Sequence, residues 1–278
     1  MNLLLPPLAA ETMFNIGSFP VTNSYVNSSV TVLLFVIFAI FMNFGIKKSY
    51  FKNSAPTGIV NFFEGVLEFL LGYFDQVTRD RKRSLRFLPI VGGLFLFILV
   101  ANWLALLPGT GSIGVWQMHH GKMELIPLFR PSNADLNMTL AMAVFAVLSS
   151  HLIGVMAIGF FKYANKYIKL GDLFKAIISL KPVNILTAII ELFVGIIEIF
   201  SEIAKMVSLS LRLYGNVFAG EVLLTVLASL VSVGIPLPFI ALEIIVGLIQ
   251  ATVFSLLTLV YLNIAVTEPH SAHASNPH

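Results

Sequence analysis

The chain has 278 residues, of which 57% are hydrophobic and only 11% are charged, with a formal net charge of +3. Soluble domains carry about 25% charged residues, so this composition excludes a soluble globular protein and indicates several membrane crossings. Cysteine is absent, which excludes disulfides and thiolate metal sites. Residues 1–25 lack the basic start of a cleavable signal peptide, and we expect them to form an outer N-terminal segment.

Long apolar stretches predict the membrane helices in chain order. They cover residues 26–46, 87–107, 136–161, 183–233 and 237–266. Each reaches the length of about 20 residues that a crossing of the bilayer needs. We therefore expect an all-α membrane protein, a single multi-pass domain with about five membrane helices, followed by a polar tail over residues 267–278.

Residues 56–86 separate the first two spans and carry a different pattern. Apolar residues recur there every three or four positions, interrupted by Glu64, Glu68 and Asp75. This pattern predicts an amphipathic helix that lies at the membrane interface. A sixth span is the alternative interpretation of the same segment.

The last apolar region, residues 183–266, is too long for two upright helices. Its first part spans roughly 50 residues, which would make a helix about 75 Å long, against a hydrocarbon core about 30 Å thick. We expect that helix to be steeply tilted or nearly horizontal. Gly234, Pro236 and Pro238 then break the chain, so the last two long helices should form a hairpin.

The distribution of Lys and Arg predicts the orientation in the membrane. These residues gather between the first two spans and between the third and fourth, whereas only Lys122 and Arg130 lie between the second and third. The positive-inside rule then places the N-terminus outside and the C-terminus in the cytoplasm. The basic run over residues 79–86 fits an anchor to anionic lipid better than a nucleic-acid site, and no nucleic-acid partner is expected.

A polar stripe follows the fourth apolar region. Its members share one helix face within roughly 80°. They are Glu191, Glu198, Glu202, Lys205, Arg212 and Asn216. Arg212 is the most informative member, because a guanidinium near the middle of the bilayer costs about 2.5–3.5 kcal/mol and indicates an ion pathway.

Some members of the stripe also have a purely structural interpretation. Glu191 and Glu202 can extend toward the membrane interface, as long charged side chains near helix ends often do. Glu198 and Lys205 can form an ion pair, and Asn216 can hydrogen-bond a neighbouring helix.

The hairpin register predicts two contacts across the last two helices. One register brings Arg212 level with Gln250 and Glu221 level with Glu243. The carbonyl oxygen of Gln250 could then accept a hydrogen bond from Arg212 without neutralising it. Two neighbouring carboxyls in a low dielectric cannot both ionise, so Glu221 and Glu243 would share a proton.

Four segments of the chain resemble subunit a of the F-type ATP synthases. They are SLSLRLYGNVFAGE at 208–221, NWLALLP at 102–108, PSNADLNMTL at 131–140, and the last helix over 247–262. The resemblance implies proton translocation through two offset half-channels beside a rotating c-ring, which couples a proton gradient to ATP synthesis. It also implies that this chain alone has no catalytic chemistry, cofactor or metal.

The resemblance further implies partners and a location. The partners are the c-ring, the b-type subunits of the peripheral stalk and the lipid of an energy-transducing membrane, most naturally the bacterial plasma (inner) membrane. Arg212 would be the essential cation that faces each ring carboxyl. The residues implied to line or support the proton path are Glu198, Asn216, Glu221, Glu243 and Gln250. Further candidates for lining it are Asp135, Asn137, Glu202, Lys205 and Ser208.

Two other functions are alternatives to proton translocation, and the sequence fits each of them less well. A secondary ion-coupled membrane transporter would be expected to show internal repeats, which the chain does not show, and five spans do not divide into two halves. A purely structural scaffold would not carry so many ionisable groups in one hairpin. His119 and His120 could bind a metal, but an outer loop without a metal is the simpler interpretation, as for the histidines of the tail.

Overall fold

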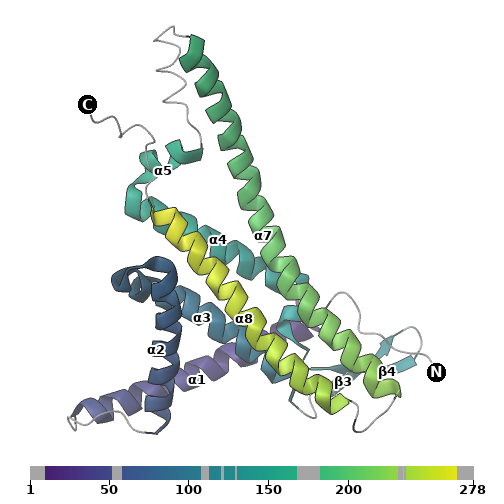
Figure 1. The fold of residues 1–278 in the computed structure, drawn as a ribbon. Coiled ribbons are helices and arrows are strands. Elements are labelled where there is room, and N and C mark those ends of the chain that lie inside the picture. The colour runs from purple at the N-terminus through teal and green to yellow at the C-terminus, as the bar shows by residue number, and fades with distance from the viewer. Residues whose placement is uncertain are drawn as a thin grey trace.

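The computed structural model describes residues 10–51, 58–107, 113–119, 122–128, 130–167, 182–230, 234 and 236–267 (Figure 1). The helices are α1 (Asn23–Phe51), α2 (Ile59–Thr78), α3 (Arg81–Ala105), α4 (Leu136–Ile158), α5 (Phe160–Tyr167), α7 (Pro182–Leu230) and α8 (Pro236–Val266), with the short 3-10 helix η2 (Ser132–Ala134). The strands are β1 (Thr12–Ile16), β2 (Phe19–Thr22), β3 (Gly114–His119) and β4 (Lys122–Pro127). The predicted all-α membrane class is confirmed.

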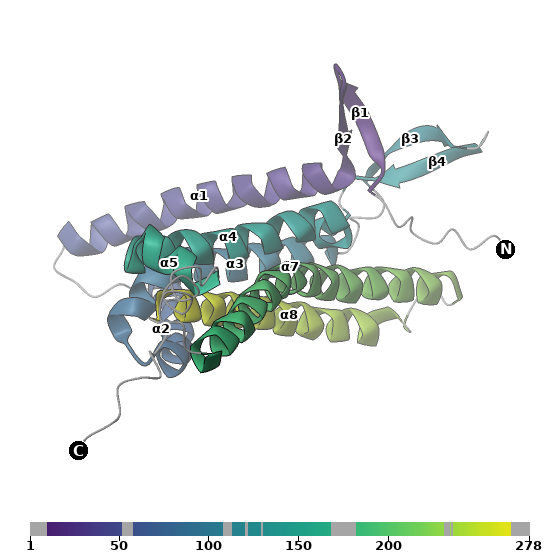
Figure 2. The same cartoon turned by 90° about the horizontal axis from the view of Figure 1, so that it is seen from above.

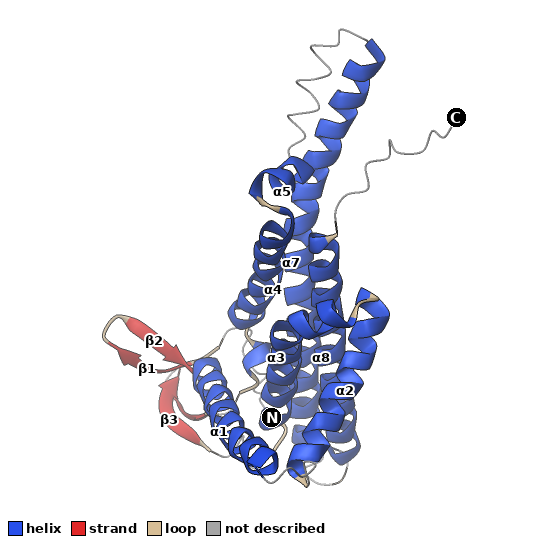
Figure 3. Cartoon of the chain, turned by 90° about the vertical axis from the view of Figure 1, so that its left-hand side faces the viewer, coloured by secondary structure: helices blue, strands red, loops and turns tan. Residues whose placement is uncertain are grey.

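Four of the described helices are long and apolar enough to cross a membrane, namely α1, α3, α4 and α8. The remaining long helix, α7, runs unbroken for 49 residues and carries the polar stripe. At 1.5 Å per residue its length is about 74 Å. Figure 3 shows its N-terminal part extending beyond the rest of the bundle.

The helices place different elements at the two ends of the molecule. Figure 2 shows both β-hairpins at one end and α2 and α5 at the opposite end. We call the first the hairpin end. We call the second the basic end, because it carries Arg79, Arg81, Lys82 and Lys162.

The amphipathic helix is shorter than predicted, and the second span is longer. The helix α2 ends at Thr78, where Arg79 adopts a left-handed conformation with φ 54°. The side chain of Asp80 then accepts a hydrogen bond from the backbone nitrogen of Lys82 and starts α3 at Arg81 instead of residue 87. The basic run therefore belongs to the first turns of α3.

The third span also ends earlier than predicted, at Ile158 instead of residue 161. Gly159 has φ 94° and stops the helix, since that conformation strains other residues. The chain continues as α5, whose Tyr163 packs its ring against Gly154. A Cβ at position 154 would meet that ring and the backbone oxygen of Ala265.

The two β-hairpins were not predicted. The strands β1 and β2 pair within the N-terminal segment, and β3 pairs with β4 in what was expected to be an irregular outer loop. His119 ends β3, whereas His120 and the tail histidines lie outside the described residues. Within the described ranges, no group of three or more His, Asp or Glu side chains could hold a metal.

The core lies between α2, α3, α4, α7 and α8. Its largest fully buried side chains include Phe74, Phe87, Ile98, Phe254, Leu259 and Leu262. Many large apolar side chains of α1 and α7 are exposed instead, as expected for helices that face lipid. Between α7 and α8 the chain turns at Gly234, with φ 97°, and Pro236 begins α8.

Candidate functional site

The polar stripe of α7 runs along the border between a packed face and an open face. Leu209, Leu213 and Val217 are buried on the packed side. The opposite side, which we call the open face of α7, is exposed and rich in small residues. It consists of Ala204, Ser208, Leu211, Arg212, Gly215 and Ala219.

Arg212 lies on the open face and is exposed. It makes no hydrogen bond or ion pair with any residue in the described part of the chain. Its charge is permanent, because a guanidinium is not deprotonated in proteins. A permanent cation on an uncovered helix face is expensive in lipid, and this side chain has no counter-charge within the described part of the chain.

The predicted hydrogen bond between Gln250 and Arg212 is not formed in the described structure. Oε1 of Gln250 accepts a hydrogen bond of 2.7 Å from Nδ2 of Asn216, one turn further along α7. The register of the hairpin is nevertheless close to the predicted one, because Glu243 lies against Gly220, the neighbour of Glu221. The other end of the Gln250 amide, Nε2, is buried and has no partner among the described residues.

The carboxylate of Glu221 pairs with Arg130 and not, as the hairpin register predicted, with Glu243. Nε of Arg130 lies 3.0 Å from Oε1 of Glu221, and Nη2 lies 3.1 Å from Oε2. Only 2% of the arginine side chain and 18% of the glutamate side chain are exposed. This partner was not predicted, although Arg130 directly precedes the matched segment that begins at Pro131.

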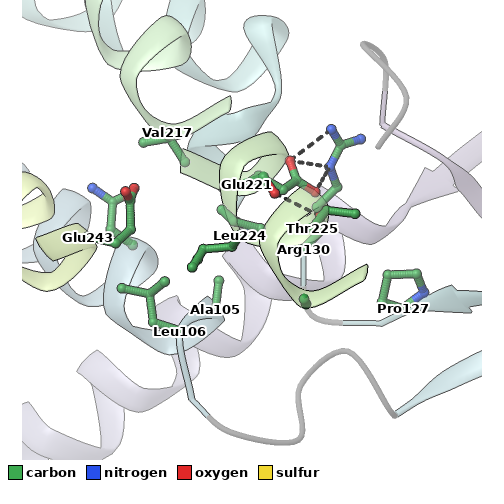
Figure 4. Close-up of a pocket in the computed structure, with 12 residues that line it drawn as sticks. Ala105, Leu106, Pro127, Arg130, Val217, Glu221, Leu224, Thr225 and Glu243 are labelled. Atoms are coloured by element: carbon green, nitrogen blue, oxygen red, sulfur yellow. Dashed lines mark hydrogen bonds and ion pairs between the residues drawn. The ribbon is translucent and has the colours of Figure 1, made fainter. Parts of the chain in front are cut away.

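Glu243 faces a different neighbour. Its carboxylate lies directly over Gly220 of α7, and a Cβ at that position would overlap both oxygens. Figure 4 shows Glu243 on one side of a cavity and the pair of Arg130 and Glu221 on the other. The cavity has a volume of about 330 Å³, enough for several water molecules.

The cavity is also lined by Asn102 of α3, another residue that sequence reasoning missed. Its Oδ1 accepts a hydrogen bond of 2.6 Å from Asn133, whereas its Nδ2 is buried without a partner in the described part of the structure. The Cβ of Asn102 lies beside Gly247, which is one turn from Glu243 and one turn from Gln250 on α8. Polar atoms with unused hydrogen-bonding capacity thus run from the cavity toward Asn216.

A second polar cluster lies at the basic end. Lys205 pairs with Glu202 at 2.7 Å. The alternative structural interpretation, a pair with Glu198, is not formed, because residues three apart on a helix lie together whereas residues seven apart are separated by two turns. His151 of α4 lies 3.7 Å from the second oxygen of Glu202 and 2.8 Å from the hydroxyl of Tyr163.

This basic-end cluster is tightly packed. Nζ of Lys205 lies 5.2 Å from the ring centre of Tyr261, and the space left between the side chains is only about 10 Å³. His151, Tyr163 and Tyr261 were not predicted, since each comes from a different helix and only the tertiary structure brings them together. The cluster joins α4, α5, α7 and α8.

The remaining predicted residues take varied positions. Asp135 is nearly buried and caps α4, where its Oδ1 accepts a hydrogen bond of 3.0 Å from the backbone nitrogen of Asn137. The side chain of Asn137 is exposed. Glu191 and Glu198 are partly buried on α7, between the basic-end cluster and the start of the helix.

The sequence comparisons agree with the four matched segments. The family profile described as "ATP synthase A chain" matches residues 28–263. The chain is 29% identical to ATP synthase subunit a of Moorella thermoacetica over 250 residues, which cover 90% of this chain and 93% of the relative.

Two other relatives show the same extent of similarity. ATP synthase subunit a of Mycobacterium ulcerans is 28% identical over 91% of this chain and 90% of its own length. ATP synthase subunit a 2 of Syntrophotalea carbinolica is 30% identical over 84% of both chains. The chain therefore belongs to the ATP synthase A chain family.

Proposed function

We propose that this chain conducts protons through two offset half-channels at an interface with the rotating c-ring, and so couples a proton gradient to ATP synthesis. The chain itself performs no covalent chemistry in this proposal. Its role is to control where a ring carboxyl gains and loses its proton.

The position of Arg212 is the observation that carries the proposal. Its permanent charge lies on the open face of α7 without a partner in the described residues. A passing ring carboxyl would meet the guanidinium there and release its proton, since an opposite charge favours the ionised form. The small residues Ser208, Gly215 and Ala219 on the same face permit a close approach of another helix.

The cavity at the hairpin end supports an outer half-channel. A proton entering it meets Glu243 and then the polar atoms of Asn102, Gln250 and Asn216, which lead toward Arg212. The unpaired amide nitrogens of Asn102 and Gln250 are sites where water molecules can complete a hydrogen-bonded path. Glu221 lines the same cavity.

The stripe on the other side of Arg212 supports an inner half-channel. Glu198 is the partly buried acid of that section, and Glu202 and Lys205 follow in the basic-end cluster. Arg212 lies between the two sections, so its charge separates them and prevents a proton from crossing directly.

The topology follows from the same charges. The basic end would face the cytoplasm and the hairpin end the opposite side, in agreement with the positive-inside rule. The extended N-terminal part of α7 would then lie nearly in the membrane plane, against the ring and the b-type subunits of the peripheral stalk. The single domain over residues 1–278 would lie in a bacterial plasma membrane.

Substitution of Arg212 tests the proposal. The assembled complex with Arg212→Ala, reconstituted into liposomes, should lose ATP-driven proton pumping. Leu211→Ala on the same face is the matched control and should retain most of it, because it removes contact area without removing charge. Normal pumping by Arg212→Ala would contradict the proposal.

A further inference from the structure

The structure adds a fixed counter-ion to the cavity at the hairpin end. Arg130 comes from the segment after β4, and its guanidinium holds both carboxylate oxygens of Glu221 on α7. Paired arginine and carboxylate groups of this geometry are among the strongest hydrogen-bonded ion pairs in proteins. The arginine side chain is only 2% exposed, so salt screens this pair less than it screens a surface pair.

The backbone around Arg130 is fixed from two directions. Nδ2 of the fully buried Asn27 on α1 donates a hydrogen bond of 2.9 Å to the carbonyl oxygen of Arg130. On the other side, the bond of 2.6 Å between Asn133 and Asn102 fixes η2 against α3. The backbone that carries Arg130 is therefore held by buried contacts to α1 and α3.

Three acids in the described structure lie at or near this cavity. Glu221 bonds to the guanidinium directly, Glu243 lines the opposite side of the cavity, and Glu11 of the N-terminal segment lies close enough to interact electrostatically with Glu221. Glu243 lies over Gly220 and is turned toward α7, where the polar atoms lead to Arg212.

We propose that Arg130 is the permanent counter-ion of Glu221. In this arrangement proton transport requires the ion pair to be formed, and Glu221 does not itself carry the proton. The pair is a neutral wall of the cavity, and Glu243 is the carboxyl that exchanges protons. Arg130 is thus a positioning residue that acts through Glu221. This inference rests on the proposed function, because it assigns separate roles to two carboxyls of the outer half-channel.

The two single substitutions disturb the charge in opposite ways. In Glu221→Gln the arginine loses its carboxylate partner but keeps its charge, which repels protons entering the cavity. In Arg130→Gln the carboxylate remains alone in a low dielectric and takes up a proton itself. Either change should reduce proton-driven ATP synthesis about tenfold, since removing one partner of a buried pair costs several kcal/mol.

The double variant Arg130→Gln with Glu221→Gln is the decisive measurement. It removes both charges and keeps two amides that can bond to each other, so synthesis in reconstituted complexes should recover to within about threefold of the parent. A synthesis rate no higher than that of Glu221→Gln alone would overturn the inference, because Glu221 would then be an obligatory relay. Should Arg130→Gln fail to assemble, the comparison of Glu221→Gln with the double variant still decides.

Two controls separate pairing from structure. Arg130→Gln combined with Glu243→Gln should synthesise ATP no faster than Glu243→Gln alone, because Glu243 is not the partner of the arginine. A recovery as large as that of the Arg130→Gln and Glu221→Gln double variant would contradict the assignment. In Arg130→Gln, the rate of ATP synthesis plotted against outer pH should show one additional step, which disappears in the double variant. Persistence of that step in the double variant would also contradict the assignment.

Failure of this inference is distinguishable from failure of the proposed function. If Arg212→Ala still pumps protons, the half-channel proposal fails whatever the Arg130 variants do. If Arg212→Ala is inactive and the double variant shows no recovery, only the counter-ion role of Arg130 fails.

Discussion

Gly220 offers a way to move the carboxylate of Glu243 without changing its chemistry. A Cβ at this position overlaps both carboxylate oxygens, and a carbon–oxygen contact needs about 3.3 Å. The Gly220→Ala variant must therefore displace the end of the Glu243 side chain by about 1 Å. The rest of the helix should be unharmed, because alanine in place of glycine favours a helix by about 1 kcal/mol.

The expected effect on transport is large for so small a change. A displacement of about 1 Å in a group that transfers a proton can reduce a rate on the order of 10²-fold. The flexible glutamate can relax in part, so a reduction of at least about tenfold in proton-driven ATP synthesis is expected. The assay uses reconstituted complexes and a fixed pH gradient, and the amount of assembled chain is measured by immunoblot.

The matched control is Gly93→Ala on α3, where a Cβ would enter open space. It gives α3 the same gain in helix preference and should leave the synthesis rate unchanged. A parental rate in Gly220→Ala, with normal assembly, would refute the placement of Glu243 in the proton path.

Two further predictions concern stability. Asp135→Ala removes the cap of α4 and should lower the free energy of unfolding by about 1 kcal/mol. Asp135→Asn keeps an oxygen that can cap the helix and should retain most of the stability. Equal thermal midpoints for the parent and both variants would contradict this prediction. Gly154→Ala should destabilise the chain by about 1–3 kcal/mol, because the added methyl meets the ring of Tyr163 and the carbonyl oxygen of Ala265. If Tyr163→Ala in the same chain does not relieve part of that loss in thermal unfolding of the purified complex, the ring is not the obstacle.

The sequence determined the class of the protein and the location of its most important charge. Apolar stretches of span length identify membrane helices because every backbone polar group in lipid must be bonded within its own segment. The helix α7 is long and unbroken because residues 183–230 contain no proline. The turn between α7 and α8 follows from Gly234 and Pro236. Arg212 is conspicuous in sequence because a charge is rare among apolar residues.

The ends of several elements depended on local contacts that periodicity does not reveal. Asp80 starts α3 before the apolar stretch begins, and Gly159 ends α4 before that stretch is over. The strands of the two β-hairpins are too short and too mixed in composition to be recognised by periodicity, which needs several repeats.

Only the tertiary structure decided which polar groups meet. Gln250 bonds to Asn216 and not to Arg212, although Asn216 and Arg212 lie one turn apart on the same side of α7. Arg130 reaches Glu221 across 91 positions of the chain, a separation at which no sequence spacing predicts a contact. The sequence therefore supplies the charges, and the packing of α1, α3 and η2 around Arg130 decides which of them pair with one another.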